Sequence, residues 1–310
     1  MEKAFTIIVT YNGASWIVKC ISSLLNSTAK TSIIIIDNAS TDDTVQLIQP
    51  FFNQLTLIRN TENKGFGQAN NQGMEIAIRE NADYCFLLNQ DVYVFKNTIS
   101  LLLAALKERP EYGIISPLQL NAGGTDIDNN LKNYIRKKYS EKSFSAMLNE
   151  NETAGDQKIY PMRFINAASW MISKKCLQQT GLFHPVFYHY GEDNHYASRV
   201  QFHGYRLGLL PASKVIHDRN TNPGNDKNIL IRKIKTIPLY TLLDIRKPFP
   251  LAYLLGFMKF KSLAKKLKAF GDEETDLIAA QQRFWFTKKF KEAKQIRTKS
   301  KKRALLNLQQ

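Results

Sequence analysis

The chain has 310 residues, of which 44% are apolar and 23% are charged. This balance is ordinary for a globular enzyme and excludes an intrinsically disordered chain. The formal net charge of +16 would suggest nucleic acid or an anionic membrane as a partner, so its distribution along the chain matters more than its total.

The positive charge is concentrated in the C-terminal part of the sequence. Residues 1–224 contain 22 Lys and Arg against 20 Asp and Glu, whereas residues 225–310 contain 21 against 7. We therefore expect a near-neutral catalytic domain over residues 1–224 and a basic, mostly helical extension over residues 225–310.

The three cysteines, Cys20, Cys85 and Cys176, are widely separated. They offer neither a disulfide framework nor a CxxC metal site. The sequence contains no run of about 18 uncharged apolar residues, and the apolar run near its start is too short for a signal peptide or a membrane anchor. These features favour a cytoplasmic location.

The first half of the chain alternates predicted strands with predicted helices. Continuous apolar runs predict strands that are buried on both faces of a parallel sheet, and apolar residues at helical spacing predict the helices between them. This alternation predicts a doubly wound, Rossmann-like α/β domain. The predicted strands cover residues 5–10, 33–36, 55–58 and 84–88, and the predicted helices begin after Ser15, at residue 40 and at residue 68.

Polar residues follow the predicted strands of this half. In open α/β sheets, ligands bind beyond the carboxyl ends of the strands, so we expect these residues to share one site. The polar groups are Thr10-Tyr11-Asn12, Asp37-Asn38, Asn63-Lys64-Gly65 and Asn89-Gln90-Asp91.

The second half begins with a polar segment over residues 121–158. Two interpretations stay open for it, a flap over the site and a surface insertion without a role. After it we expect a strand over residues 164–172, a helix that opens at Glu192-Asp193, and a last short strand over residues 206–210.

Two acidic positions are candidates for chemistry. Asp91 ends a predicted buried strand, where it could hold Mg²⁺ or Mn²⁺ against phosphate oxygens or simply cap a turn. Glu192 and Asp193 open a helix, where acidic side chains also stabilise the helix dipole. Because they follow an aromatic run, residues 187–190, they also fit a general base beside a partly apolar acceptor cleft.

Five ordered blocks carry a resemblance to a known family. They are FTIIVTYNGASWIVKCISSLL, IIIIDNASTDDT, NKGFGQANNQGMEIA, FLLNQDV and GLFHPVFYHYGEDNHYASRV. In this order and spacing, over residues 5–217, they resemble family 2 glycosyltransferases with the GT-A fold, a mixed sheet flanked by helices.

The resemblance implies an inverting, metal-dependent transfer of a sugar from a nucleotide diphosphate to a saccharide or lipid-linked acceptor in cell-surface polysaccharide synthesis. Asp193 matches the catalytic base, with Glu192 beside it, and Asp91 matches the metal-binding end of the DxD motif. Asn89 takes the first acidic position of that motif, as in relatives similar to rhamnosyltransferases. This departure leans slightly toward dTDP-rhamnose as the donor, with UDP-sugars close behind.

The resemblance also implies contacts to the donor at the strand ends. Asp37 would bond the base or ribose, and Lys64, Gly65 and Asn70 would lie near the ribose and phosphates. The full set of donor-contact candidates is Thr10, Tyr11, Asn12, Asp37, Asn38, Lys64, Gly65, Asn70, Asn89 and Gln90.

Two further residues have two interpretations each. His217 follows the last predicted strand, where the family often places a metal or phosphate ligand, but a lone histidine is also commonly structural. Trp170 could stack on a sugar face, although a place in the core is favoured.

The basic tail contains residues 249–270, in which apolar residues and lysines alternate at nearly helical spacing. This pattern indicates either a helix in the interface of an anionic membrane or a helix packed on the catalytic domain. We favour peripheral contact with the inner face of the cytoplasmic membrane. No nucleic-acid partner is expected, since no recognised nucleic-acid motif is present.

Two alternative functions fit these residues less well than sugar transfer does. A nucleotidyltransferase would need a glycine-rich, basic signature after the first strand, and Thr10-Tyr11-Asn12 lacks one. An inactive nucleotide-sugar binding module would not need Asp91 and Asp193, which are retained.

Overall fold

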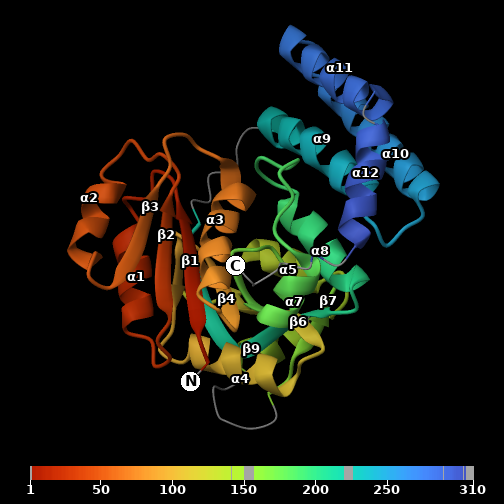
Figure 1. Ribbon diagram of the computed structural model, residues 1–310. Coiled ribbons are helices and arrows are strands. Elements are labelled where there is room, and N and C mark those ends of the chain that lie inside the picture. Colours follow the sequence, from red (N-terminus) through yellow and green to blue (C-terminus); the bar gives the residue numbers. More distant parts are fainter. Residues whose placement is uncertain are drawn as a thin grey trace.

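The structure, a computed structural model, describes residues 2–140, 142–149, 157–219, 226–288, 290–302 and 304. Its centre is a nine-stranded mixed sheet with the strand order β3-β2-β1-β4-β8-β6-β9-β5, and β7 pairs with β9 outside this path (Figure 1). The strands are β1 Ala4–Thr10, β2 Ser32–Asp37, β3 Leu55–Arg59, β4 Tyr84–Asn89, β5 Val92–Val94, β6 Tyr112–Leu120, β7 Tyr160–Met162, β8 Ser169–Ser173 and β9 Arg206–His217.

Helices cover both faces of this sheet and form the C-terminal part of the chain. They are α1 Ile17–Leu25, α2 Thr44–Ile48, the short 3-10 turn η1 Gln49–Phe51, α3 Gly65–Arg79, α4 Thr98–Glu108, α5 Asn129–Ile135, α6 Lys142–Leu148, α7 Lys174–Thr180, α8 Glu192–Phe202, α9 Asp226–Leu242, α10 Phe249–Lys268, α11 Glu273–Lys288 and α12 Phe290–Lys301.

The parallel half of the sheet agrees with the predicted alternation. Strands β1 to β4 pair in parallel in the order β3-β2-β1-β4. In β2, Ile33 and Ile35 belong to one core with Ile17 of α1, whereas Ile34 and Ile36 belong to a second core that includes residues of α3. The continuous apolar run of β2 therefore exists because both faces of the strand are buried.

The other half departs from the predicted strands in two places. The strand expected over residues 164–172 is only Ser169–Ser173, paired antiparallel with β4 and β6, and the residues before it approach the cleft described below. The last strand does not stop at Leu210 but continues to His217. Pairing with β6 passes from Leu210 to Lys214 through an irregularity, so a bulge accommodates Pro211, which cannot donate a hydrogen bond to the ladder.

The polar segment over residues 121–158 has a core of its own in its described part. Leu131 and Ile135 of α5 and Phe144 and Met147 of α6 are buried against residues of β7 and β9. The side chain of Asp128 caps α5 by accepting hydrogen bonds from the backbone N–H groups of Asn130 and Leu131. This segment is therefore folded onto the sheet edge, and closure over the site stays a prediction.

Helices α9 to α12 pack around a separate apolar cluster next to α8 (Figure 1). Buried Arg297 of α12 donates hydrogen bonds to the carbonyl oxygens of Leu242 and Asp244, at 2.7 and 2.6 Å. Ala304 N donates to Gln179 O at 3.0 Å, so the end of the described chain contacts α7. No helix within the described ranges is long and apolar enough to cross a membrane. The domain boundary at residue 224 stays a prediction.

Candidate active site

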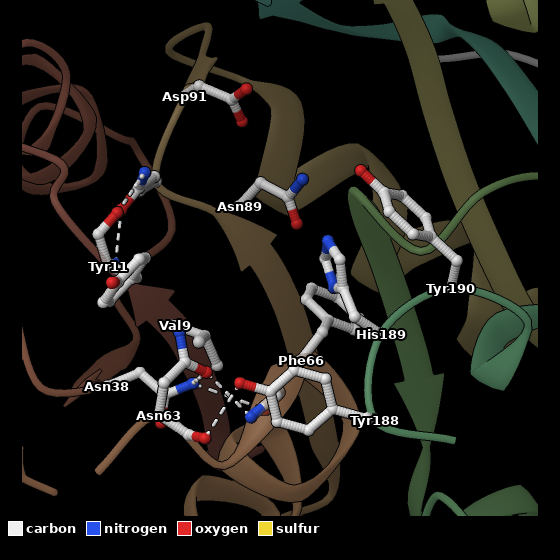
Figure 2. A pocket seen from close by; sticks show the side chains of 12 residues that line it. Val9, Tyr11, Asn38, Asn63, Phe66, Asn89, Asp91, Tyr188, His189 and Tyr190 are labelled. Atoms are coloured by element: carbon white, nitrogen blue, oxygen red, sulfur yellow. Dashed lines mark hydrogen bonds between the residues drawn. The ribbon is translucent and has the colours of Figure 1, made fainter. Parts of the chain in front are cut away.

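A cavity of about 510 Å³ lies at the carboxyl ends of β1, β2 and β4 and the start of α3. Figure 2 shows Asn89 between Tyr11 on one side and His189 and Tyr190 on the other. We name this space the sheet-edge cavity. Its lining residues are Val9, Tyr11, Asn38, Asn63, Gly65, Phe66, Asn89, Gln90, Asp91, Tyr188, His189 and Tyr190.

A second cavity of about 440 Å³ is lined by Glu192 and Asp193, and we name it the carboxylate cavity. The two cavities share five lining residues, Phe66, Asn89, Asp91, His189 and Tyr190, and together form one cleft. The other residues that line the carboxylate cavity are Asn130, Tyr134, Asn166, Ala167, Ala168, His217, Arg219, Arg232, Lys233 and Thr236.

Several residues that are predicted to contact the nucleotide sugar hydrogen-bond to one another and connect the loops around the sheet-edge cavity. Gln90 Oε1 accepts hydrogen bonds from Thr10 Oγ1 at 2.6 Å and from the Tyr11 backbone N–H at 2.9 Å. Asn38 Oδ1 accepts from the Lys64 backbone N–H at 3.0 Å. These bonds join the end of β4 to the end of β1, and the end of β2 to the start of α3. The backbone at the floor of the cavity is therefore held in place by side chains.

Three other candidates, Asp37 and Asn12 at strand ends and Asn70 within α3, do not line either cavity. Asp37 is 1% exposed and its carboxylate oxygens lie 3.4 Å from the Ser40 backbone N–H. Asn12 accepts a hydrogen bond from the Thr41 backbone N–H, and Asn70 donates within α3. Their predicted contacts with the donor stay predictions.

The start of α3 closely approaches the aromatic run. Gly65 has a φ of +77°, and a Cβ atom at this position would overlap the carbonyl oxygen of Tyr188. Only glycine combines this backbone conformation with this approach. Trp170, in contrast, is fully buried in the core beside Tyr196, so its interpretation as a core residue is confirmed.

The sheet register brings the two predicted metal ligands together. In the pairing of β5 with β9, Val92 lies opposite His217, and Asp91 immediately precedes β5. Asp91 Oδ1 is 3.4 Å from His217 Nε2, without the geometry of a hydrogen bond. Asp91 Oδ1 and Asn89 Oδ1 are buried and have no hydrogen-bond partner among the described residues.

These orphaned oxygens fit a divalent cation whose shell is completed by ligand oxygens. Among the described residues, no three His, Cys, Asp or Glu side chains gather to hold a metal ion by themselves. Mg²⁺ is commonly bound by one or two carboxylates together with substrate phosphates. His217 Nδ1 lies 3.3 Å both from Gln119 Oε1 and from Arg219 Nε. His217 Nε2 can join Asp91 as a ligand in the tautomer in which Nδ1 carries the proton and donates it to Gln119.

The two acidic residues at the start of α8 lie in different environments. Burial, and then the charge of Asp193, raise the pKa of Glu192 to about 8. Burial raises the pKa of Asp193 to about 6, although hydrogen bonds from the backbone and side-chain N–H groups of Asn194, at 2.7 and 3.0 Å, oppose this rise. Asp193 accepts two hydrogen bonds that favour its ionised form, whereas the buried Glu192 Oε2 has no hydrogen-bond partner in the described part of the chain. Of the two carboxyls, Asp193 is therefore the better candidate for the base.

The sequence interpretation missed the contribution of α9 to the cleft. Arg232 and Lys233 line the carboxylate cavity, and the Arg232 guanidinium lies over the Tyr190 ring, 4.6 Å from its centroid. Helical periodicity alone gives no signal of which surface a helix contacts, so the tail was expected to act separately from the catalytic domain.

Relatives of this chain are glycosyltransferases. The chain is 25% identical over 222 residues to glycosyltransferase GlyG of Streptococcus pneumoniae serotype 4, which covers 70% of this chain and 68% of the relative. It is 21% identical over 240 residues to N-acetylglucosaminyl-diphospho-decaprenol L-rhamnosyltransferase of Mycobacterium tuberculosis, which covers 71% of this chain and 77% of the relative.

Solved structures share the fold. S. aureus TarS 1–349 in complex with UDP-GlcNAc has a TM-score of 0.59 at 13% identity, with 96% of this chain and 89% of that chain covered. The mannosyltransferase PcManGT of Pyrobaculum calidifontis, in complex with GDP-Man and Mn²⁺, has a TM-score of 0.55 at 16% identity, with 96% and 84% covered. These structures confirm the expected GT-A fold. The sequence profile described as glycosyl transferase family 2 matches residues 6–175, and the chain therefore belongs to this family.

Proposed function

We propose that this glycosyltransferase is inverting and metal-dependent, and that it moves a sugar from a nucleotide diphosphate to a saccharide or lipid-linked acceptor in cell-surface polysaccharide synthesis. The positions of the Asp91 and Asp193 carboxylates along the cleft are the main support for this proposal. Asp91 lines both cavities, whereas Asp193 lines only the carboxylate cavity. The leaving diphosphate would therefore lie at the boundary, with the nucleotide on one side and the acceptor on the other.

The sheet-edge cavity is proposed to hold the nucleotide. The TarS and PcManGT structures were solved with UDP-GlcNAc and with GDP-Man and Mn²⁺, respectively, which supports a nucleotide sugar and a divalent cation here. Likeness to a rhamnosyltransferase supports dTDP-rhamnose, and likeness to TarS supports a UDP-sugar, so both stay candidates. Bound Mg²⁺ or Mn²⁺, held by Asp91 with His217 and the Asn89 oxygen, would neutralise charge on the departing diphosphate.

Transfer is proposed to occur by a single displacement. The Asp193 carboxylate removes the proton from an acceptor hydroxyl, and the acceptor oxygen attacks the anomeric carbon as the bond from that carbon to the phosphate oxygen breaks. The diphosphate leaves with the bonding electrons, and the anomeric centre inverts. Because Glu192 would be protonated, no second negative charge would lie beside the Asp193 carboxylate.

Helix α10 supports the proposed peripheral contact with the inner face of the cytoplasmic membrane. Its inner side, including Ala252 and Phe260, is buried in the helical cluster, while Leu254 and Met258 are 54% and 58% exposed. Lys261, Lys265 and Lys268 continue the exposed side toward the C-terminal end of the helix. An exposed apolar strip followed by lysines is typical of a helix that contacts anionic lipid.

Replacement of the proposed base and of the proposed metal ligand separates their roles. Asp193→Asn should lower the transfer rate at least ~100-fold, because the acceptor proton loses its base, while leaving Mn²⁺-dependent nucleotide binding intact. Asp91→Ala should abolish both. Transfer is measured with a donor that supports wild-type turnover, and nucleotide binding by calorimetry. Wild-type turnover by Asp193→Asn would refute its assignment as the base.

The raised pKa of Glu192 predicts a pH-dependent gain in stability for Glu192→Gln. Between pH 4.5 and about 8 the native state holds a proton that the unfolded state has lost, so wild-type stability falls as pH rises through this range. Gln carries no such proton. The variant should therefore melt several degrees above the wild type at pH 8.5, with a smaller difference at pH 5.

Exposed Glu75 of α3 supplies the matched control, because Glu75→Gln removes a carboxylate that lies in solvent. Thermal melts of both variants and the wild type at the two pH values check the prediction. A Glu192→Gln difference that does not change with pH would contradict the buried, protonated state of Glu192.

The exposed side of α10 predicts binding to anionic vesicles. The wild type should sediment with phosphatidylglycerol vesicles at low salt and be released at high salt, because salt screens the lysines. Leu254→Glu combined with Met258→Glu should weaken this binding, whereas Leu47→Glu, at an exposed leucine on α2, should not. If the wild type stays in solution with these vesicles, the membrane contact is wrong.

A further inference from the structure

The carboxylate cavity contains cations that the proposed transfer step does not use. Arg219, which follows β9, and Arg232 and Lys233 of α9 line this cavity. None of them is among the described residues that line the sheet-edge cavity. The positive charge therefore lies on the side of Asp193, where the acceptor is proposed to bind, and not beside the nucleotide.

The three cations differ in their contacts. Arg219 Nε is 3.2 Å from Asp128 Oδ2 and 3.3 Å from His217 Nδ1, so its charge already has an acidic partner inside the protein. Arg232 and Lys233 are exposed, and neither makes an ion pair with an acidic side chain in the described part of the chain. Their charges are available to a ligand.

Packing fixes the position of the helix that carries these two side chains. Ile234, the next residue of α9, is 1% exposed and is buried in the cluster that also includes Phe187, so α9 is held against the segment that leads to α8. Thr236, one turn after Arg232, also lines the carboxylate cavity. The Arg232 guanidinium stacks on Tyr190, which lines both cavities. A rigid helix, and not a loop, therefore presents the cations.

The chemistry of these groups selects an anion. The hydroxyls of a neutral saccharide can be bound by neutral hydrogen-bonding side chains and need no formal charge, whereas Arg and Lys are the common ligands of phosphate. Two cations without acidic partners beside a carboxylate base are useful when the ligand itself carries negative charge, since that charge would otherwise be repelled by Asp193.

We propose that Arg232 and Lys233 bind a phosphate group of the acceptor, esterified near the sugar whose hydroxyl Asp193 deprotonates. This inference rests on the proposed function and narrows the acceptor to a glycosyl phosphate. Arg219 and Thr236 lie close enough to line the same space and complete a polar wall around the phosphate.

Binding of a phosphorylated and a neutral form of one sugar tests the inference. The probes are N-acetylglucosamine 1-phosphate and methyl N-acetylglucosaminide, titrated into the full chain saturated with Mn²⁺ and UDP or dTDP. The wild type should bind the phosphate more tightly. Arg232→Gln and Lys233→Gln should each weaken its binding on the order of tenfold without changing the binding of the methyl glycoside.

Lys235→Gln is the matched control, because Lys235 is exposed on the same helix and does not line the cavity. It should leave the binding of both probes unchanged. Equal binding of the two probes by the wild type, or unchanged phosphate binding by Arg232→Gln and Lys233→Gln, would overturn the inference. Weaker binding of the nucleotide by these two variants would also overturn it, because the cations would then serve the leaving diphosphate.

Binding of UDP or dTDP by the wild type shows whether a negative result concerns the nucleotide site or the two cations. A wild type that binds neither UDP nor dTDP with Mn²⁺ counts against the donor site itself, whereas normal nucleotide binding without a preference for the phosphate counts only against Arg232 and Lys233.

A glycosyl phosphate can come from a lipid carrier or from a polymer with phosphodiester links, and competition separates the two sources. Displacement of N-acetylglucosamine 1-phosphate by phosphatidylcholine vesicles that contain polyprenyl phosphate would identify the lipid. Displacement by a soluble glycerol phosphate oligomer, and not by these vesicles, would identify the polymer.

Discussion

The antiparallel pairing of β5 with β9 is the contact on which the rest of the cleft depends. Val92 lies opposite His217 in this pair, so Asp91 and His217 meet although they are far apart in the sequence. Strand β9 is also paired with β6 and β7, which ties the position of His217 to the core of the sheet. If His217 binds a metal as proposed, a side chain held in this way needs little reorganisation when a charged substrate arrives, as electrostatic stabilisation of a leaving group requires.

Charge is arranged along the cleft in an order that suits sugar transfer. Asp91 lines both cavities, Asp193 lies on the side where the acceptor is proposed to bind, and burial beside Asp193 raises the pKa of Glu192. Helix α9 then adds Arg232 and Lys233 on the same side as Asp193. The basic tail therefore contributes two cations to the cleft in addition to its proposed membrane contact.

The parallel half of the fold could be predicted because local sequence determines it. The run Ile33–Ile36 is apolar throughout since both faces are covered, and the polar residues that follow each strand meet at one edge. The extent of β9 could not be predicted, because the bulge that accommodates Pro211 depends on pairing with β6. Polarity at a strand end also does not tell whether a side chain faces a cavity or a neighbouring loop, as Asp37 illustrates by its contact with Ser40. The contribution of α9 to the cleft could not be predicted either, because it depends on how this helix packs against the rest of the chain.

The proposed transfer requires a nucleotide diphosphate and a divalent cation to bind together at Asp91. Thermal melting of the wild-type chain with UDP, dTDP and GDP, each with and without Mn²⁺, tests it most directly, because a ligand that binds only the native state raises the melting temperature. We expect a rise with UDP or dTDP that requires Mn²⁺. An unchanged melting temperature with every nucleotide, in the presence and absence of the metal, would show that no nucleotide and metal bind together at Asp91.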